Sequence, residues 1–156
     1  MKQYYKAILG EKNTMYYQTK FEEFDSKGET ITVSWNWSAF FIAPAWALYR
    51  KMYGWFFILA IILFLSDLLG KIGENNWAFV VWFIPWVTFS LLANTLYHKN
   101  LRKKIMKAKK NIADEKKLIR YLEYKSGVNG WVVWCFWGIF IIGILAGVLI
   151  PIYAGN

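Results

Sequence analysis

The chain has 156 residues, of which 57% are hydrophobic and 21% aromatic, and its formal net charge is +9. A soluble domain of this length could bury one aromatic-rich apolar segment but not three, because too little polar surface would be left to cover them. Composition therefore disfavours a soluble globular protein and favours an integral membrane protein. The single cysteine, Cys135, can form no internal disulfide, and we expect it to be a small buried side chain.

Residues 1–33 form a polar, tyrosine-rich segment that is predicted to be cytoplasmic. No apolar signal-peptide core follows the early lysines, so we expect insertion to use internal segments. A short helix is predicted at residues 13–24, because Tyr17, Phe21 and Phe24 then share one helical face. We expect that face to pack on the cytoplasmic base of the bundle.

The next stretch, SWNWSAFFIAPAWALYRKMYGW, is as apolar as a membrane span until Arg50 and Lys51 interrupt it. Its apolar part is short for a span and contains Pro44, and a crossing would put the charged residues 1–33 outside the cell. We therefore predict an interfacial or re-entrant helix at residues 35–49 in the cytoplasmic leaflet. A full crossing, which would give four spans, stays open as the alternative.

Three further segments are long and apolar enough for transmembrane helices, and they complete a membrane domain over residues 34–153: residues 53–70, 77–96 and 131–153. The third is the clearest, since its 23 uncharged residues would form a helix about 34 Å long. The second contains Pro85, which we expect to kink it or to remove one backbone hydrogen bond.

Lysine and arginine set the predicted orientation. Residues 99–125 hold eleven of them against three acidic residues, whereas residues 70–76 hold one lysine and one glutamate. The positive-inside rule places the basic segment in the cytoplasm. With three spans, the N-terminus is then cytoplasmic and the C-terminus lies outside.

The basic segment is predicted to form one cytoplasmic helix over residues 98–126, continuous with the second span. Apolar residues recur along it at a spacing of four and three, and Glu115 interrupts that pattern. The helix could pack against residues 1–33, or lie on anionic lipid as a basic amphipathic helix. Nucleic-acid binding is disfavoured, because the positive-inside bias at a membrane exit already accounts for the charge. The predicted fold is therefore an all-α membrane protein with three transmembrane helices, an interfacial or re-entrant helix and a basic cytoplasmic helix.

A string of aromatic and charged residues near the N-terminus resembles a known family. It combines a Tyr-Tyr helix with Asn-Trp-Ser-Ala-Phe-Phe at residues 36–41, Trp46, and Tyr-Arg-Lys-Met-Tyr at residues 49–53. Together with LIRYLEYKSGVNG further along, this resembles the uncharacterised bacterial membrane-protein family called domain of unknown function 2628.

The resemblance covers about residues 13–130 and has two departures. Ser38 stands where the family pattern has Ala or Pro, and Gly127 stands alone where a pair of glycines is common. The resemblance implies a small protein of the bacterial inner membrane, and it implies no activity.

The main group of candidate site residues is expected to contact anionic headgroups or an acidic partner at the cytoplasmic face. For Arg50 and Lys51 the alternative is a plain juxtamembrane anchor, and for Asn36 it is a helix cap. The group comprises Trp35, Asn36, Trp37, Trp46, Tyr49, Arg50, Lys51, Tyr53, Lys99, Arg102, Lys103 and Lys104.

Polar and small residues within the spans form the remaining candidates. Asp67 and Asn94 are candidates for an intramembrane polar site, although water at the outer interface would also satisfy Asp67, and Asn94 could bond between helices. Gly143 and Gly147 have the spacing of close helix packing, within the monomer or in a homodimer. His98 has no acidic or cysteine neighbour in the sequence that would make a metal site, so we predict an interfacial residue.

No nucleophile–base pair, metal-ligand set or cofactor motif is visible in the sequence, so we expect no catalytic residues, metal or cofactor. The predicted function is that of a non-enzymatic interaction, regulatory or scaffold component. Its expected partners are anionic lipid headgroups, a membrane protein or a second copy of the chain. The alternative is an accessory or immunity-type protein linked to transport of a small solute or a membrane-active peptide, and it rests on Asp67 and the polar half of the second span.

Overall fold

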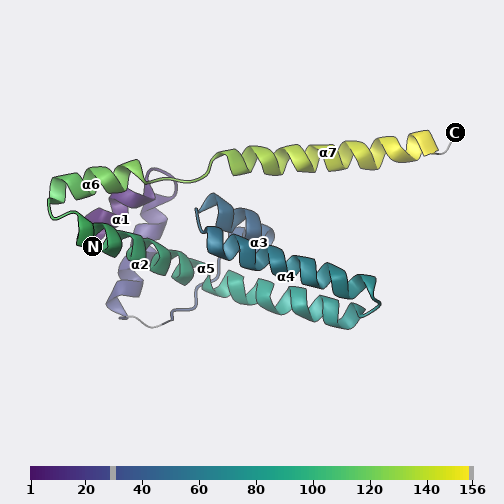
Figure 1. Ribbon diagram of the computed structural model, residues 1–156, viewed down its shortest axis with the longest axis horizontal. Coiled ribbons are helices and arrows are strands. Elements are labelled where there is room, and N and C mark those ends of the chain that lie inside the picture. The colour runs from purple at the N-terminus through teal and green to yellow at the C-terminus, as the bar shows by residue number, and fades with distance from the viewer. Residues whose placement is uncertain (29–30, 155–156) are drawn as a thin grey trace.

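The computed structural model describes residues 1–28 and 31–154, with side chains for residues 1–28, 31–139 and 141–145. This described part is all-helical, which confirms the predicted fold class at that level (Figure 1). The helices are α1 (Lys2–Leu9), α2 (Thr14–Ser26), α3 (Trp37–Tyr49), α4 (Tyr53–Lys71), α5 (Asn75–Asn111), α6 (Glu115–Tyr124) and α7 (Trp131–Ala154).

Two short helices form the N-terminal segment. The predicted helix is present as α2, and its face of Tyr17, Phe21 and Phe24 is buried as expected. It packs on the later part of α5, where the Tyr17 and Tyr97 ring centroids are 5.1 Å apart. Helix α1 was not predicted; it has only 8 residues and is buried mainly through apolar side chains around Tyr5.

Helix α3 begins at Trp37, two residues after the predicted start, because Asn36 caps it. The Asn36 side chain accepts a hydrogen bond of 2.9 Å from the backbone amide of Ala39. A kink at Ile42 divides the helix two residues before Pro44, which has no backbone N–H and disfavours a straight helix through this point.

The carbonyl that Pro44 leaves without its helical donor finds a partner on α5. The indole N–H of Trp86 donates to the backbone oxygen of Phe40, which lies four residues before Pro44. At one end of α3, Asn36 bonds to Asn94, and at the other end the Arg50 guanidinium lies against the Tyr97 ring. Both ends of α3 therefore meet α5 within one turn, at Asn94 and Tyr97, whereas Phe40 meets α5 about two turns earlier, at Trp86.

Helices α4 and α5 form an antiparallel hairpin (Figure 1). Both are long and apolar enough to cross a membrane, and only 6% of the most apolar stretch of α4 and 28% of that of α5 are buried. Helix α5 continues through Pro85 as one helix of 37 residues, so the proline removes a backbone bond without ending the helix.

The prediction of a single basic helix over residues 98–126 is wrong. Helix α5 does continue directly from the apolar segment, but it ends at Asn111, and Ile112 is extended. Asp114 then starts α6, and its carboxylate accepts from the backbone amide of Lys117 at 3.0 Å. The break turns α6 back onto α1 and α5.

Helix α7 leaves the polar end of the molecule and extends in the same general direction as the α4–α5 hairpin (Figure 1). Most of its described side chains are apolar and exposed, and they include Cys135, so the prediction that this cysteine is buried is wrong. Residues 131–145 form an apolar helix, and the side chains of the rest of the predicted third span lie outside the described residues.

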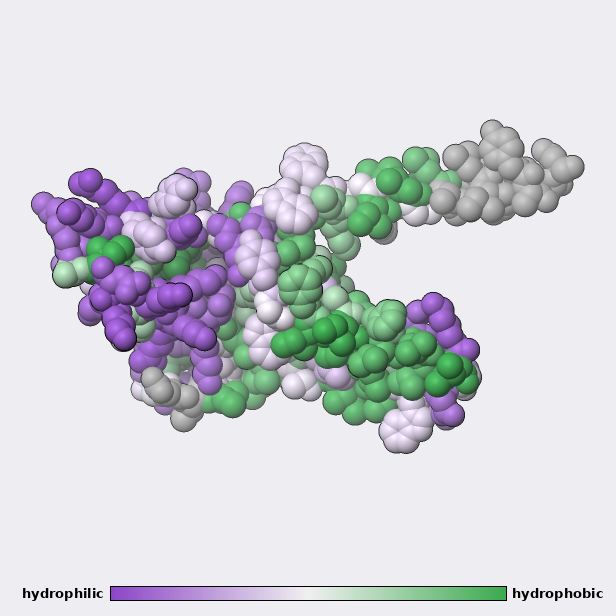
Figure 2. Space-filling model, in the orientation of Figure 1, coloured by the Kyte–Doolittle hydropathy of each residue, from purple (hydrophilic) through white to green (hydrophobic). Residues whose placement is uncertain are grey.

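Polar and apolar surfaces separate along the molecule (Figure 2). Hydrophilic residues gather over α1, α2, α6 and the second half of α5, whereas hydrophobic residues cover α3, α4 and the first half of α5. A small hydrophilic patch returns at the far end of the α4–α5 hairpin. An apolar zone therefore lies between two polar ends.

Candidate anion-binding site

The turn between α3 and α4 holds a lysine in a backbone conformation that favours glycine. The Met52 amide donates to the Ala47 carbonyl at 2.8 Å, and the Lys51 amide donates to the Leu48 carbonyl at 3.1 Å. This pair of bonds is the Schellman pattern of helix ends, in which the left-handed position is usually glycine. Here that position is Lys51, with φ of 56°.

The turn between α4 and α5 uses the same pattern with the usual residue. The Glu74 amide donates to the Leu69 carbonyl at 3.0 Å, and the Gly73 amide donates to the Gly70 carbonyl at 3.2 Å. Gly73 occupies the left-handed position with φ of 90°. The same chain therefore ends two neighbouring helices alike, and only the turn at Lys51 carries backbone strain.

Arg50, next to this lysine, is buried rather than exposed at the membrane surface. Only 4% of the residue is exposed, and its guanidinium lies 4.4 Å from the Tyr17 ring centroid and 5.3 Å from those of Tyr49 and Tyr97. Its Nε and Nη1 atoms have no hydrogen-bond partner among the described residues. Arg50 is therefore covered by aromatic rings that stabilise its charge, and it is not exposed to solvent.

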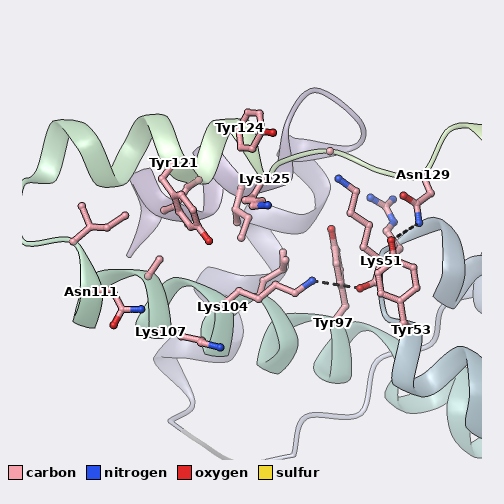
Figure 3. A pocket seen from close by; sticks show the side chains of 17 residues that line it. Lys51, Tyr53, Tyr97, Lys104, Lys107, Asn111, Tyr121, Tyr124, Lys125 and Asn129 are labelled. Carbon is pink, nitrogen blue, oxygen red and sulfur yellow. Dashed lines mark hydrogen bonds between the residues drawn. The ribbon is translucent and has the colours of Figure 1, made fainter.

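A cavity of about 810 Å³ opens beside this turn (Figure 3). One wall is the turn itself, a second is the later part of α5, and a third is α6 with the segment that follows it. The lining residues are Ile8, Arg50, Lys51, Tyr53, Tyr97, Leu101, Lys104, Lys107, Ala108, Asn111, Ile112, Tyr121, Leu122, Tyr124, Lys125, Gly127 and Asn129.

The charged residues that line the cavity all have the same sign. Arg50, Lys51, Lys104, Lys107 and Lys125 are cationic, and the lining includes no carboxylate. The lysines Lys51, Lys104, Lys107 and Lys125 come from the turn, from α5 and from the end of α6, and they surround the opening (Figure 3). The cavity is therefore an electropositive site of a size typical for small ligands.

Two lysines are held in place at the wall of the cavity. The Lys51 ammonium donates to the Ser126 carbonyl at 2.7 Å, and the Lys104 ammonium donates to the Lys51 carbonyl at 3.3 Å. Although the Lys104 side chain is exposed, burial around its ammonium, followed by repulsion from Lys51, lowers its pKa. Across the opening, the Asn129 amide donates to the Leu48 carbonyl at 2.8 Å, which ties the third wall to the turn.

A second polar cluster lies deeper, where α3 begins against α5. The Asn36 amide donates to the side-chain oxygen of Asn94 at 2.8 Å, and the Asn94 amide lies within hydrogen-bond distance of Tyr16 and Ser34. Asn94 is fully buried. Asn36 therefore caps α3 and also forms a hydrogen bond to α5. Asn94 belongs to a buried set of hydrogen-bonded side chains and does not face an open polar path.

The tryptophans predicted to contact headgroups differ in how far the structure exposes them. Trp37 is 64% exposed, as a headgroup contact requires. Trp46 is buried against Phe89 and Tyr97, so its ring is not available for the predicted contact with headgroups. Trp35 is half-buried, and its indole nitrogen is buried without a hydrogen-bond partner among the described residues.

His98 belongs to a buried polar cluster that its sequence neighbours did not indicate. Its Nε2 lies 2.9 Å from the Tyr5 hydroxyl and 2.9 Å from a carboxylate oxygen of Asp25. Burial lowers the pKa of His98, and the nearby Asp25 carboxylate opposes this shift in part. Both partners are distant in sequence, so no local pattern indicated them.

A smaller cavity of about 350 Å³ lies beside His98. Lys99, Arg102 and Lys103 line it, so the structure separates these three predicted residues from the cavity at the turn. Only Arg50, Lys51, Tyr53 and Lys104 of the predicted group meet there.

The remaining candidates lie apart from both cavities. Asp67 is exposed and pairs with Lys71 at 2.6 Å, one turn along α4. Gly143 has no heavy atom within 4 Å of the position its Cβ would take, so the described residues provide no close packing there. The surroundings of Gly147 lie outside the described side chains.

Sequence reasoning missed the cations on the far walls of the cavity. Lys107 and Lys125 lie in a basic segment, and nothing in the sequence distinguishes them from its other lysines. The turn between α5 and α6 brings them to the same cavity. Within the described part of the chain, no group of three or more His, Cys, Asp and Glu is arranged to hold a metal ion.

The fold and the cavity define a class of small helical protein in which, among the described residues, two helices are long and apolar enough to cross a membrane and an electropositive cavity lies at their basic end. The model of the family described as protein of unknown function (DUF2628) matches residues 6–103, and the chain belongs to that family. This confirms the resemblance, although the match begins earlier and ends earlier than the sequence strings suggested. No curated protein and no solved structure matches the chain.

Proposed function

We propose that this chain is a small, non-enzymatic, polytopic protein of the bacterial inner membrane that acts as an interaction, regulatory or scaffold component. The observation that carries this is the division of the surface: the apolar α4–α5 hairpin is mostly exposed, and the basic helical unit adjoins one end of it. Exposing an apolar surface of this extent to water is unfavourable, whereas contact with the acyl chains of a bilayer is not.

The proposed topology places the basic unit in the cytoplasm, with α4 running outward, α5 inward and α7 outward as a third span. Helices α1 and α2 pack against the basic part of α5 and against one another, which supports a cytoplasmic N-terminus. The path of α3 supports a re-entrant helix, since both of its ends meet α5 near Asn94 and Tyr97. Its kink reaches Trp86, about 12 Å deeper by helical rise.

The cytoplasmic face would contact anionic lipid through its many lysines, each of which can add roughly 1 kcal/mol near a charged surface. A membrane-protein partner or a second copy of the chain would occupy the exposed apolar faces. No contact of the described residues favours the transport-linked alternative over this function, because Asp67 pairs with Lys71 at the exposed end of α4 rather than facing a polar path.

Single-cysteine labelling in intact cells tests the topology. In a Cys135→Ser background, Ile72→Cys in the α4–α5 turn is expected to react with a membrane-impermeant maleimide from outside. Glu11→Cys and Lys110→Cys, both at exposed positions, are expected to react only after the cells are opened. Labelling of Glu11→Cys from outside would show that α3 crosses the bilayer, and recovery of the chain in the soluble fraction would overturn the proposed function.

A further inference from the structure

The cavity beside the α3–α4 turn has positive charge and hydrogen-bond donors that no described residue compensates. Its five cations have no carboxylate among the lining residues to neutralise them. Two nitrogen atoms of the buried Arg50 side chain have no hydrogen-bond partner among the described residues. Buried donors are almost always satisfied in folded proteins, so two arginine nitrogens without an acceptor, in a residue that lines a cavity, favour an anion as the ligand there.

The geometry of the turn adds an independent observation. Lys51 holds the left-handed position that glycine occupies in the equivalent turn at Gly73. Backbone strain of this kind persists where the side chain has a use that offsets it. At this position the Lys51 ammonium reaches the cavity wall beside Lys104.

We propose that this cavity binds a phosphate group, carried by a lipid headgroup or by a small soluble phosphate compound. Phosphate presents several strong acceptor oxygens and up to two negative charges, so it can engage several cations that approach from different sides. A single carboxylate has only two acceptor oxygens in one plane, so it could engage fewer of the five cations at the same time. The hydroxyls of Tyr53, Tyr97, Tyr121 and Tyr124 and the amide of Asn111 supply further donors around the same cavity.

The inference rests on the proposed function in one respect: a lipid headgroup reaches the cavity only if this end of the hairpin lies at the bilayer surface. The phosphate chemistry itself does not depend on that placement. Binding of a soluble phosphate compound can therefore succeed or fail independently of the topology experiment.

The test uses the full chain purified in a neutral detergent and, separately, in nanodiscs. Inorganic phosphate and glycerol phosphate serve as soluble probes, followed by calorimetric titration and by the rise in melting temperature that a bound ligand causes. Nanodiscs of phosphatidylcholine alone are compared with nanodiscs that contain phosphatidate or phosphatidylglycerol. Saturable binding of a soluble probe to the chain in detergent identifies a free phosphate compound as the ligand. A higher melting temperature in the anionic nanodiscs than in phosphatidylcholine alone, without binding of a soluble probe, identifies a lipid headgroup.

Matched variants separate the cavity from general charge. Lys104→Gln with Lys107→Gln removes two cavity cations, and both positions are exposed, so the fold should tolerate the change. Lys110→Gln with Lys116→Gln removes the same charge from exposed positions that do not line the cavity. We expect at least tenfold weaker phosphate binding in the first pair and less than twofold change in the second.

Two results would overturn the inference. Equal weakening by the two pairs would show that binding reflects the net charge of the segment and not the cavity. Absence of binding to every probe, with the chain correctly inserted and folded, would show that the cavity does not hold phosphate.

Discussion

The side-chain amide of Asn36 donates a hydrogen bond of 2.8 Å to Asn94, which lies 58 residues further along the chain. This contact joins the capped start of α3 to the middle of α5, inside the apolar zone of the molecule. Together with the contact between Arg50 and Tyr97, it holds both ends of α3 at one level of α5. These two contacts hold the ends of the kinked helix close to one another on α5, while Phe40 contacts Trp86 in the apolar first half of α5.

The first prediction concerns this contact. Asn94→Ala should lower the free energy of unfolding by about 1–3 kcal/mol, because it leaves the buried Asn36 amide without its acceptor. Thermal and denaturant unfolding of the chain in detergent would measure the change. Asn100→Ala is the matched control on the same helix, since its amide nitrogen has no hydrogen-bond partner among the described residues. Equal losses in the two variants would contradict a specific role for the Asn36–Asn94 bond.

The second prediction concerns the strained turn. Lys51→Gly should raise the free energy of unfolding by up to about 1 kcal/mol, because glycine adopts a φ of 56° without a steric cost. Loss of the Lys51 bond to the Ser126 carbonyl offsets part of that gain. The same variant should weaken phosphate binding, so stability and binding would move in opposite directions.

The reciprocal change is available at the other turn. Gly73→Ala should lower the free energy of unfolding by about 1 kcal/mol, since the left-handed φ of 90° disfavours any L side chain. It lies far from the cavity along α4 and should leave phosphate binding unchanged. A destabilised Lys51→Gly chain together with an unaffected Gly73→Ala chain would refute the strain argument.

The third prediction concerns pH. Burial lowers the pKa of His98 below its usual value of about 6.5, so the folded chain resists a proton that the unfolded chain accepts. The stability that this residue contributes should be complete above about pH 6.5 and should be lost as pH falls from there through the lower pKa of the folded state. Melting temperatures between pH 8 and pH 5 would measure the loss.

The control for pH dependence is direct because the chain has one histidine. His98→Gln should flatten the melting temperature between pH 7.5 and 5.5, while lowering it throughout, since the contacts with Tyr5 and Asp25 are altered. An undiminished pH dependence in this variant would show that another group is responsible.

The fourth prediction concerns Asp67. Its ion pair with Lys71 is exposed and lies one turn along the same helix, so Asp67→Asn should change the free energy of unfolding by no more than about 0.5 kcal/mol. Lys71→Gln should behave alike. A chain that stays folded but loses its cellular function on Asp67→Asn would instead favour the transport-linked alternative.

Several local features could be predicted because they depend on neighbouring residues alone. The aromatic face of α2 follows from helical spacing, and the start of α3 follows from an asparagine before an apolar run. The end of α5 was predictable in principle, since Asp114 and Glu115 form an ordinary helix start. The charge run around them obscured that signal.

Other features could not be predicted because burial depends on what covers a residue. Arg50 and His98 are polar and lie near membrane ends, which favours exposure, yet α1 and α2 cover them with aromatic rings. Cys135 has the opposite outcome, because no described helix covers its side of α7. Helix α1 is too short for its pattern to be distinguished from a loop.

Local composition and spacing are enough to predict that this chain is helical, that its apolar and basic segments are separate, and where most of its helices begin. Which charges share a site depends instead on how the helices pack against one another. The cations of the cavity come from the turn at residues 50–51, from α5 and from the end of α6, and their convergence depends on the break after Asn111 and on the strained turn at Lys51. Local spacing places residues on a helix face, but the meeting of separate helices is set by the packing that buries them.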